Sequence, residues 1–231
     1  MKRIGILGGI SHESTIEYYA RILRKYFERA GNTYYPEVVI YSLDLQKYTD
    51  FEDTGDLDGL VGYILQGIHA LKAAGVDFAL MSANSPHEVY HRVAALAGLP
   101  MISIVEVTAN AAKAAGVKKV LLLGIKFTMQ GSFYPQRFAE QGIDVITPSE
   151  SEQDEINQVI FAELCHGNFA EPIRQRFLAI IDHYREAAQI EGVILGCTEL
   201  PLLLKSGDRD IPFFDTVELH TEAALTAALA E

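Results

Sequence analysis

Residues 76–85, VDFALMSANS, and residues 190–199, IEGVILGCTE, decide how the fold of this chain is interpreted. Each stretch is an apolar run that ends in small or polar residues and leads into a helical pattern, as expected where a buried strand turns into a helix. The two stretches lie 114 positions apart, and residues 2–8, KRIGILG, match residues 118–124, KKVLLLG, at a distance of 116 positions. Two matches at nearly one offset indicate a duplicated α/β unit.

Short apolar runs alternate with longer amphipathic segments along the whole chain. Apolar strands without polar alternation, joined by helices, predict parallel sheets that are covered on both faces. The helical segments 13–30 and 59–74 each end directly before a glycine, which is the usual signal for a helix C-terminus. The predicted strands are residues 3–7, 37–43, 77–82, 101–105, 119–123, 144–147, 192–196 and 211–214.

The composition restricts the class of function. The chain has 231 residues, of which 19 are basic and 31 acidic, and its formal net charge of −12 argues against a nucleic-acid or anionic-membrane surface. It does not argue against an anionic small molecule. Two cysteines, Cys165 and Cys197, are too few for a disulfide framework or a zinc site. No apolar run approaches the ~20 residues of a membrane span, so we expect a soluble cytoplasmic protein without a metal.

The repeat gives two loops equivalent positions, one around Ala83 and one around Cys197. Ligands of parallel α/β sheets bind beyond the carboxyl ends of the strands, so we expect the two loops to face each other across one cleft. Cys197 precedes a segment that could open a helix, where the helix dipole favours the thiolate. The alternative is a small buried apolar residue. Position at a strand end favours function for Cys197, whereas Cys165 is interpreted as structural.

Short polar side chains follow the predicted strands and suit a carboxylate ligand. Such residues also cap helices routinely, and both roles can hold at once. Residues 8–15, GGISHEST, lack the GxGxxG and P-loop patterns, but their glycines allow a tight turn with close backbone approach. The substrate-binding candidates are Gly9, Ile10, Ser11, Asn84, Ser85, Lys126, Thr128, Thr198 and Glu199. Lys126 is equally interpretable as a solvated surface lysine, and His12 and Lys47 are weaker candidates.

These motifs together resemble the aspartate/glutamate racemase superfamily. They are the Gly-Gly turn after the first strand, the loop ANSPH at residues 83–87 and GCTE at residues 196–199. The similarity extends to FTMQGSFY at residues 127–134 and IPFFDT at residues 211–216. The opening GG-x-S-x-EST at residues 8–15 is most similar to the L-aspartate/glutamate-specific racemases.

The resemblance implies an α/β fold of two flavodoxin-like lobes related by pseudo-twofold symmetry, with the last strand and helix returning to the first lobe. The first lobe would comprise residues 1–100 and 212–231, and the second lobe residues 101–211. The resemblance also implies a homodimer, a small acidic amino acid as substrate, and catalysis with no cofactor, neither pyridoxal phosphate nor metal. In the family, one cysteine from each lobe flanks the substrate Cα, and donors around the α-carboxylate stabilise a carbanion-like transition state.

The sequence departs from the family pattern at Ala83. Cys197 matches the second-lobe cysteine, but alanine stands at the first-lobe position and cannot move a proton. Racemisation of aspartate or glutamate with Cys197 on one face of Cα would then need a water, Ser82, Ser85 or His87 on the other. The alternatives are a one-cysteine decarboxylase or isomerase, a binding protein that has lost turnover, and an engineered replacement at position 83.

Overall fold

The structure, a computed structural model, describes residues 1–230 and divides into two compact units. Unit 1 comprises Met1–Ile104 and the segment from Val217 onward, and unit 2 comprises Val105–Thr216. Each unit holds one four-stranded parallel sheet, with the strand orders β2-β1-β3-β4 and β6-β5-β7-β8. These orders are equivalent and follow the flavodoxin-like pattern through four strands. The prediction of an α/β fold with two flavodoxin-like parallel sheets is confirmed.

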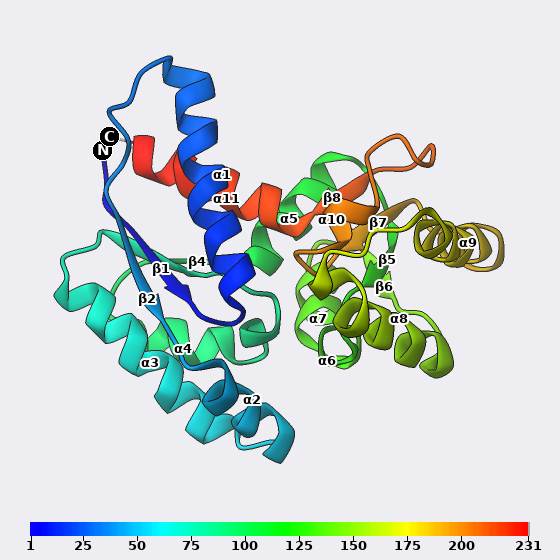
Figure 1. The fold of residues 1–231 in the computed structure, drawn as a ribbon, viewed down its shortest axis with the longest axis horizontal. Helices are drawn as coiled ribbons and strands as arrows, with labels where there is room; N and C mark the ends of the chain where they lie inside the picture. The colour runs from blue at the N-terminus through cyan, green and yellow to red at the C-terminus, as the bar shows by residue number, and fades with distance from the viewer. Residues whose placement is uncertain (231) are drawn as a thin grey trace. The chain divides into compact units, whose positions relative to one another are not determined.

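Unit 1 contains the start of the chain and its last helix, which lie close together (Figure 1). The backbone N–H of Lys2 donates to the Ala228 carbonyl at 2.8 Å. The elements of this unit are β1 (Ile4–Gly8), α1 (His12–Ala30), β2 (Val38–Ser42), α2 (Leu45–Thr54), α3 (Leu57–Ala73), β3 (Phe78–Met81), the 3-10 helix η1 (Ser85–Val89), α4 (Tyr90–Ala97), β4 (Met101–Ile102) and α11 (Thr216–Leu229).

Unit 2 repeats the sheet of unit 1 with different helices around it. Its elements are α5 (Ile104–Ala114), β5 (Lys119–Leu123), α6 (Lys126–Gln130), α7 (Phe133–Ala139), β6 (Asp144–Ile146), α8 (Glu150–Ala162), the 3-10 helix η2 (Leu164–His166), α9 (Glu171–Ala188), β7 (Gly192–Leu195), α10 (Leu200–Leu203) and β8 (Phe213–Asp215). The repeat extends to the strand register, because Ala79 pairs with Met101 in one sheet and Val193 pairs with Phe213 in the other.

Short polar caps and glycines set the predicted helix boundaries. At the start of α1, the Ser11 hydroxyl accepts a hydrogen bond from the Ser14 backbone N–H at 3.3 Å. The same helix ends at Gly31 with a φ of 63°, and Gly75 follows α3 with a φ of 79°. Glycine adopts this left-handed backbone without the steric cost that a Cβ would bring, so the chain leaves each helix at these positions.

Two expectations about the ends of the sheets are wrong. The last strand does not return to the first lobe, because β8 pairs with β7, and residues 101–104 belong to unit 1, because β4 pairs with β3. These fourth strands satisfy backbone groups that the buried strands β3 and β7 would otherwise leave unpaired. The chain therefore changes unit after each fourth strand, after Ile104 and after Thr216. The strand expected over residues 101–105 ends at Ile102, because α5 begins at Ile104.

The central strands β1 and β3 of the first sheet are buried on both faces, as their unbroken apolar sequences predict, whereas the edge strand β2 is partly exposed. Ile4 and Ile6 of β1 face the side of α1 and α11, whereas Leu7 packs with α3 (Figure 1). Burial of each such side chain stabilises the fold by about 1.5–3 kcal/mol. This packing fixes the position of β1 and of the loop at its carboxyl end. Within residues 1–230, no helix has the length and apolar character needed to span a bilayer.

Candidate active site

Unit 2 carries Cys197 in the loop after β7, residues 196–199, called here the Cys197 loop. The Cys197 thiol donates a hydrogen bond to Glu199 Oε2 at 2.8 Å, and the Thr198 hydroxyl donates to the same oxygen at 2.7 Å. Cys197 is half-buried and Glu199 is buried. The three side chains thus form one hydrogen-bonded group at the carboxyl end of a buried strand, where parallel sheets bind their ligands.

The Cys197 thiol is neutral in this environment. Burial and the negative charge of Glu199 raise its pKa well above the usual value. The expectation that a helix N-terminus favours the thiolate is wrong here, because α10 has only four residues and the thiol faces a carboxylate. The arrangement suits a proton donor, with Glu199 as the group that can remove the thiol proton.

Thr128 presents a buried hydroxyl without a hydrogen-bond partner. The side chain is fully buried, and its Oγ1 is one of four side-chain atoms in this state among residues 1–230. Thr128 lies against the ends of β5 and β7, since a Cβ added at Gly124 would lie 3.4 Å from its Cβ and one added at Gly196 would lie 3.5 Å from its Cγ2. An unpaired buried hydroxyl costs about 1–3 kcal/mol, so a ligand group would be a favourable partner here.

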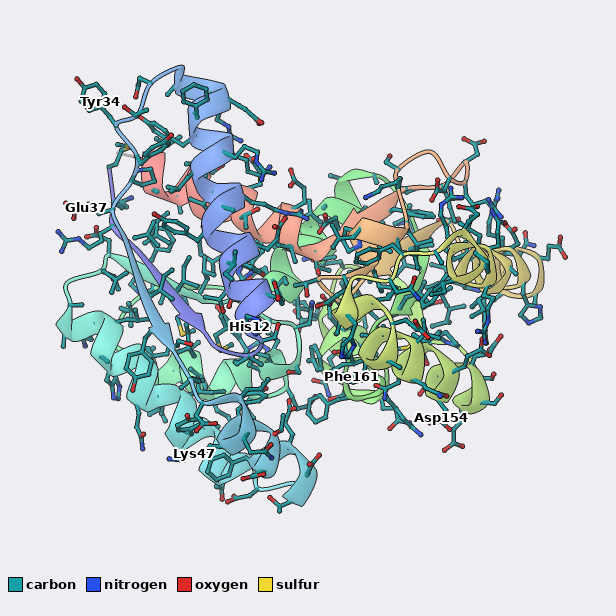
Figure 2. All side chains as sticks on the ribbon, viewed as in Figure 1. His12, Tyr34, Glu37, Lys47, Asp154 and Phe161 are labelled. Atoms are coloured by element: carbon teal, nitrogen blue, oxygen red, sulfur yellow. The ribbon has the colours of Figure 1, made fainter. Side chains whose placement is uncertain are left out.

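Lys126, by contrast, is held in an ion pair on the surface. Its ammonium lies 2.5 Å from Asp154 Oδ1, on α8, and 4.0 Å from Glu150 Oε1 (Asp154 is labelled in Figure 2). The hydrogen bond to Asp154 raises the pKa of Lys126. The structure therefore favours the interpretation as a surface lysine that neighbouring carboxylates neutralise, and not as a cation free to meet an anionic substrate.

In unit 1, the loop after β1 is held by the first turn of α1. Thr15 Oγ1 accepts a hydrogen bond from the Gly9 N–H at 2.9 Å and donates to the Ser11 carbonyl at 2.9 Å. A Cβ on Gly8 would collide with Thr15, and Gly9 has a φ of 86°, a backbone conformation that suits glycine. Ile10, which follows Gly9, is buried. The predicted binding residues 9–11 therefore form a tightly constrained turn.

The Ala83 loop, residues 82–85, follows β3 and is buried throughout. Ser82 is fully buried, and both its N–H and its hydroxyl donate to the Leu7 carbonyl, at 2.9 Å and 3.3 Å. The Ser14 hydroxyl donates to the Ser82 carbonyl. These bonds join the Ala83 loop to β1 and α1, and they leave the Ser82 hydroxyl poorly suited to act as a base.

His87 uses both ring nitrogens for hydrogen bonds to the backbone. Nε2 lies 3.1 Å from the Ile104 N–H and must accept from it, so the ring proton is on Nδ1, which donates to the Ala83 carbonyl at 3.1 Å. Burial lowers the pKa of His87 to about 3. Backbone N–H of His87 also donates to the carbonyl of the buried Asn84, at 3.0 Å. His87 is therefore a neutral residue that positions the Ala83 loop, and not a free acid or base.

Ser85 belongs to a hydrogen-bonded group that no recognised motif marks. Its hydroxyl lies 3.0 Å from the Tyr48 hydroxyl, and Tyr48 donates to Glu52 Oε1 at 2.8 Å. Tyr48 and Glu52 are four residues apart on α2 and so share one face of the helix. That spacing, in the helix after the second strand, is the only sequence signal that could have indicated them. Burial raises the pKa of Glu52, although hydrogen bonds from Tyr48 and Ser85 lower it in part.

The remaining candidates, His12, Lys47 and Cys165, take no part in the hydrogen-bonded groups described above. His12 is exposed at the start of α1, with Nε2 3.0 Å from Glu13 Oε1, and the Lys47 ammonium lies 4.4 Å from the centre of the Tyr63 ring (Figure 2). Cys165 is exposed in η2, and its electrostatic interaction with Cys197 adds a minor contribution to the raised pKa of that thiol. Over residues 1–230, no three His, Cys, Asp or Glu side chains gather in a group that could hold a metal ion.

Comparison with known proteins places this arrangement in a family. Residues 7–224 match the Asp/Glu/hydantoin racemase family. The chain is 26% identical over 230 residues to the broad specificity amino-acid racemase RacX of Bacillus subtilis (strain 168), covering 98% of each chain. It is 38% identical to PH1733, an aspartate racemase homologue from Pyrococcus horikoshii OT3, whose crystal structure aligns over the whole of both chains with a TM-score of 0.88.

A more distant structure has the same fold. The aspartate racemase of Picrophilus torridus is 21% identical, with a TM-score of 0.79 over 99% of this chain and 94% of that one. The family match covers most of the chain, and the two equivalent parallel sheets agree with it. The chain belongs to the Asp/Glu/hydantoin racemase family.

Proposed function

We propose that the protein is a cofactor-independent racemase that interconverts L- and D-aspartate, L- and D-glutamate, or both pairs. Family membership supports an enzyme of the Asp/Glu racemase type. The hydrogen bond from Cys197 to Glu199 carries the assignment of Cys197 as an acid and base at the substrate Cα. The proposal includes the homodimer and the cytoplasmic location that the resemblance implies.

The proposed chemistry depends on moving a proton at a very weakly acidic carbon. As a neutral thiol, Cys197 delivers a proton to one face of Cα. When Glu199 accepts the thiol proton, the resulting thiolate can remove a proton from the same face. Donors beside the substrate carboxylates must stabilise the carbanion-like transition state. We assign this role to Asn84, to the Thr128 hydroxyl and to the backbone N–H groups of residues 10 and 11.

The test is incubation with each enantiomer of aspartate and of glutamate in D₂O. Proton NMR follows loss of the α-hydrogen, and chiral chromatography follows the configuration. Exchange with inversion that is lost in the Cys197→Ala variant supports the proposal. An absence of exchange from all four compounds contradicts it.

A one-cysteine decarboxylase is the second candidate, and the neutral thiol of Cys197 together with a chemically inert alanine at position 83 favours it. Loss of carbon dioxide from a substituted malonate leaves a carbanion that one thiol can protonate from a single face. Carbon dioxide release with one product enantiomer in excess, in a protein that exchanges no amino-acid α-hydrogen, would favour this function over racemisation.

A further inference from the structure

The side chains around Ala83 differ in whether they can pass a proton onward. Ser82 is fully buried and its hydroxyl donates to the Leu7 carbonyl. His87 has both nitrogens engaged by the backbone. Ser85 alone among these three candidates contacts a second hydroxyl that in turn contacts a carboxylate.

The directions of these hydrogen bonds form a continuous path. Tyr48 has one hydroxyl proton and donates it to Glu52 Oε1 at 2.8 Å. The Ser85 hydroxyl lies 3.0 Å from the Tyr48 oxygen, and its single proton is shared between two acceptors, Tyr48 and Glu52, whose pKa it lowers. The Ser85 oxygen retains a lone pair for a further proton. Tyr48 is fully buried, whereas Glu52 is partly exposed, so the path leads from the buried loop to a carboxylate that can exchange protons with solvent.

The sequence repeat assigns Ser85 and Glu199 to equivalent positions. At the offset of 114 residues, Ala83 corresponds to Cys197 and Ser85 corresponds to Glu199. In unit 2 the carboxylate at this position contacts the thiol directly. In unit 1 the equivalent residue, Ser85, interacts with the Glu52 carboxylate both directly and through Tyr48. Each unit thus has one carboxylate connected by hydrogen bonds to the loop after its third strand.

We propose that Ser85, Tyr48 and Glu52 form a proton relay that replaces the missing thiol at position 83. This inference rests on the proposed racemase function. The Cα–H bond breaks, its proton forms a new O–H bond on Ser85, and the electron pair remains on Cα. The original Ser85 proton passes to Tyr48, and the Tyr48 proton passes to Glu52. Cys197 then gives its thiol proton to the opposite face of Cα, leaving a thiolate, and the reverse sequence acts on the other enantiomer.

The surroundings of Glu52 suit the final proton acceptor. Burial raises the pKa of its carboxyl above the usual value, and the charge of Asp53 acts in the same direction. A carboxylate with a raised pKa is a stronger base than one in water. Burial, followed by the negative charge of Glu52, also raises the pKa of Tyr48 well above its usual value. Tyr48 therefore stays neutral, and it gives a proton to Glu52 only as it receives one from Ser85.

The test compares α-hydrogen exchange from the two enantiomers in D₂O, using the aspartate or glutamate pair that the wild-type protein racemises. Glu52→Gln, Tyr48→Phe and Ser85→Ala each interrupt the relay, and Glu52→Gln keeps an oxygen to accept from Tyr48. Asp50→Asn removes a carboxylate that binds the exposed Gln46 side chain on the same helix, and is the matched control. Melting temperatures check that each variant is folded.

The relay predicts that the variants lose α-hydrogen exchange from one enantiomer only. Each relay variant should slow exchange from that enantiomer by about 100-fold or more, while exchange from the opposite enantiomer, which depends on Cys197, stays within about threefold of wild type. Cys197→Ser should show the opposite pattern. Equal slowing from both enantiomers, or wild-type exchange in Glu52→Gln, would overturn the relay and leave the racemase intact. Inactivity of the wild-type protein would refute the racemase itself, and the relay with it.

Discussion

Glu199 accepts the thiol proton of Cys197 in a hydrogen bond of 2.8 Å, two residues further along the same loop. The thiol and the carboxylate that can deprotonate it are therefore held next to each other by one short loop. Burial, followed by the negative charge of Glu199, raises the pKa of the thiol and favours its protonated form. In the proposed racemase, Cys197 would therefore begin either by donating this proton to the substrate or by transferring it to Glu199.

Glu199→Gln separates these two effects of the carboxylate. Removing the negative charge should lower the pKa of Cys197, but only in part, because burial is the larger cause of its elevation. The same change removes the acceptor of the thiol proton and should slow racemisation by about 100-fold. The pH dependence of thiol alkylation measures the first effect, in a Cys165→Ala background because Cys165 is exposed. An unchanged alkylation midpoint would contradict the assigned contact.

Ala83→Cys should make the relay unnecessary. A thiol at position 83 restores the two-cysteine pattern. The double variant Ala83→Cys/Glu52→Gln should therefore racemise its substrate at least tenfold faster than Glu52→Gln alone. Ala83→Ser/Glu52→Gln is the matched control, since a hydroxyl adds similar bulk without a comparably acidic proton. Recovery by serine as well as by cysteine would count against a thiol-specific effect. Ala83 is buried, so the melting temperatures of both variants must be compared.

Thr128→Val and Thr15→Val should have opposite effects on stability. Valine at position 128 removes a buried hydroxyl without a partner, so the free energy of unfolding should stay constant or rise by up to about 1 kcal/mol, while KM rises about tenfold. Valine at position 15 removes a hydroxyl that bonds Gly9 and Ser11, and should lower the free energy of unfolding by about 1–3 kcal/mol. Urea denaturation and steady-state kinetics measure both. An unchanged KM in Thr128→Val would remove Thr128 from the binding site.

Stability should fall as the pH drops below about 6.5, the usual pKa of histidine. Burial lowers the pKa of His87 to about 3 and that of His220 to about 4. The unfolded chain therefore binds more protons than the folded chain between these values, and each histidine should lower the free energy of unfolding by about 1.4 kcal/mol per pH unit. Carboxyl groups whose pKa is lowered in the folded chain act at lower pH, below about 4.5.

His220→Gln tests the origin of this slope. His220 Nε2 lies 2.9 Å from the Ile102 carbonyl, and Nδ1 lies 2.9 Å from the Tyr18 hydroxyl. Glutamine can still donate to Ile102 but does not titrate. Urea unfolding of this variant between pH 5 and pH 6.5 should show about half the wild-type slope. A slope equal to that of the wild type would assign the effect to other groups.

The local features of the fold could be predicted from the sequence because their causes are local. Unbroken apolar runs indicated all eight strands, and a glycine marked the ends of α1 and α3. The repeat correctly predicted two equivalent sheets. The sequence did not reveal which sheet β4 and β8 join, because that choice depends on which strand edge is open in the folded chain.

Contacts between distant residues account for the rest of the site. Tyr48 and Ser85 are 37 positions apart, and their contact depends on how α2 packs beside the Ala83 loop. Asp154 neutralises Lys126 from 28 positions away, so a lysine beside a strand end was not evidence of an anion site. Likewise, the Ile104 N–H that engages His87 belongs to the segment where the chain leaves unit 1. Spacing alone indicates such partners only where they share one helix, as Tyr48 and Glu52 do.

The changes of unit after β4 and β8 exchange a helix between the two halves of the sequence. Apart from their first residues, the helix after β4, α5, belongs to unit 2 and the helix after β8, α11, belongs to unit 1. Each half of the sequence therefore ends in a helix that completes the other half. Two protomers that exchange a terminal element in this way form a domain-swapped dimer. Here both copies belong to one chain, and α11 packs with Ile4 and Ile6, so residues 1–104 alone would leave part of this apolar face open to solvent.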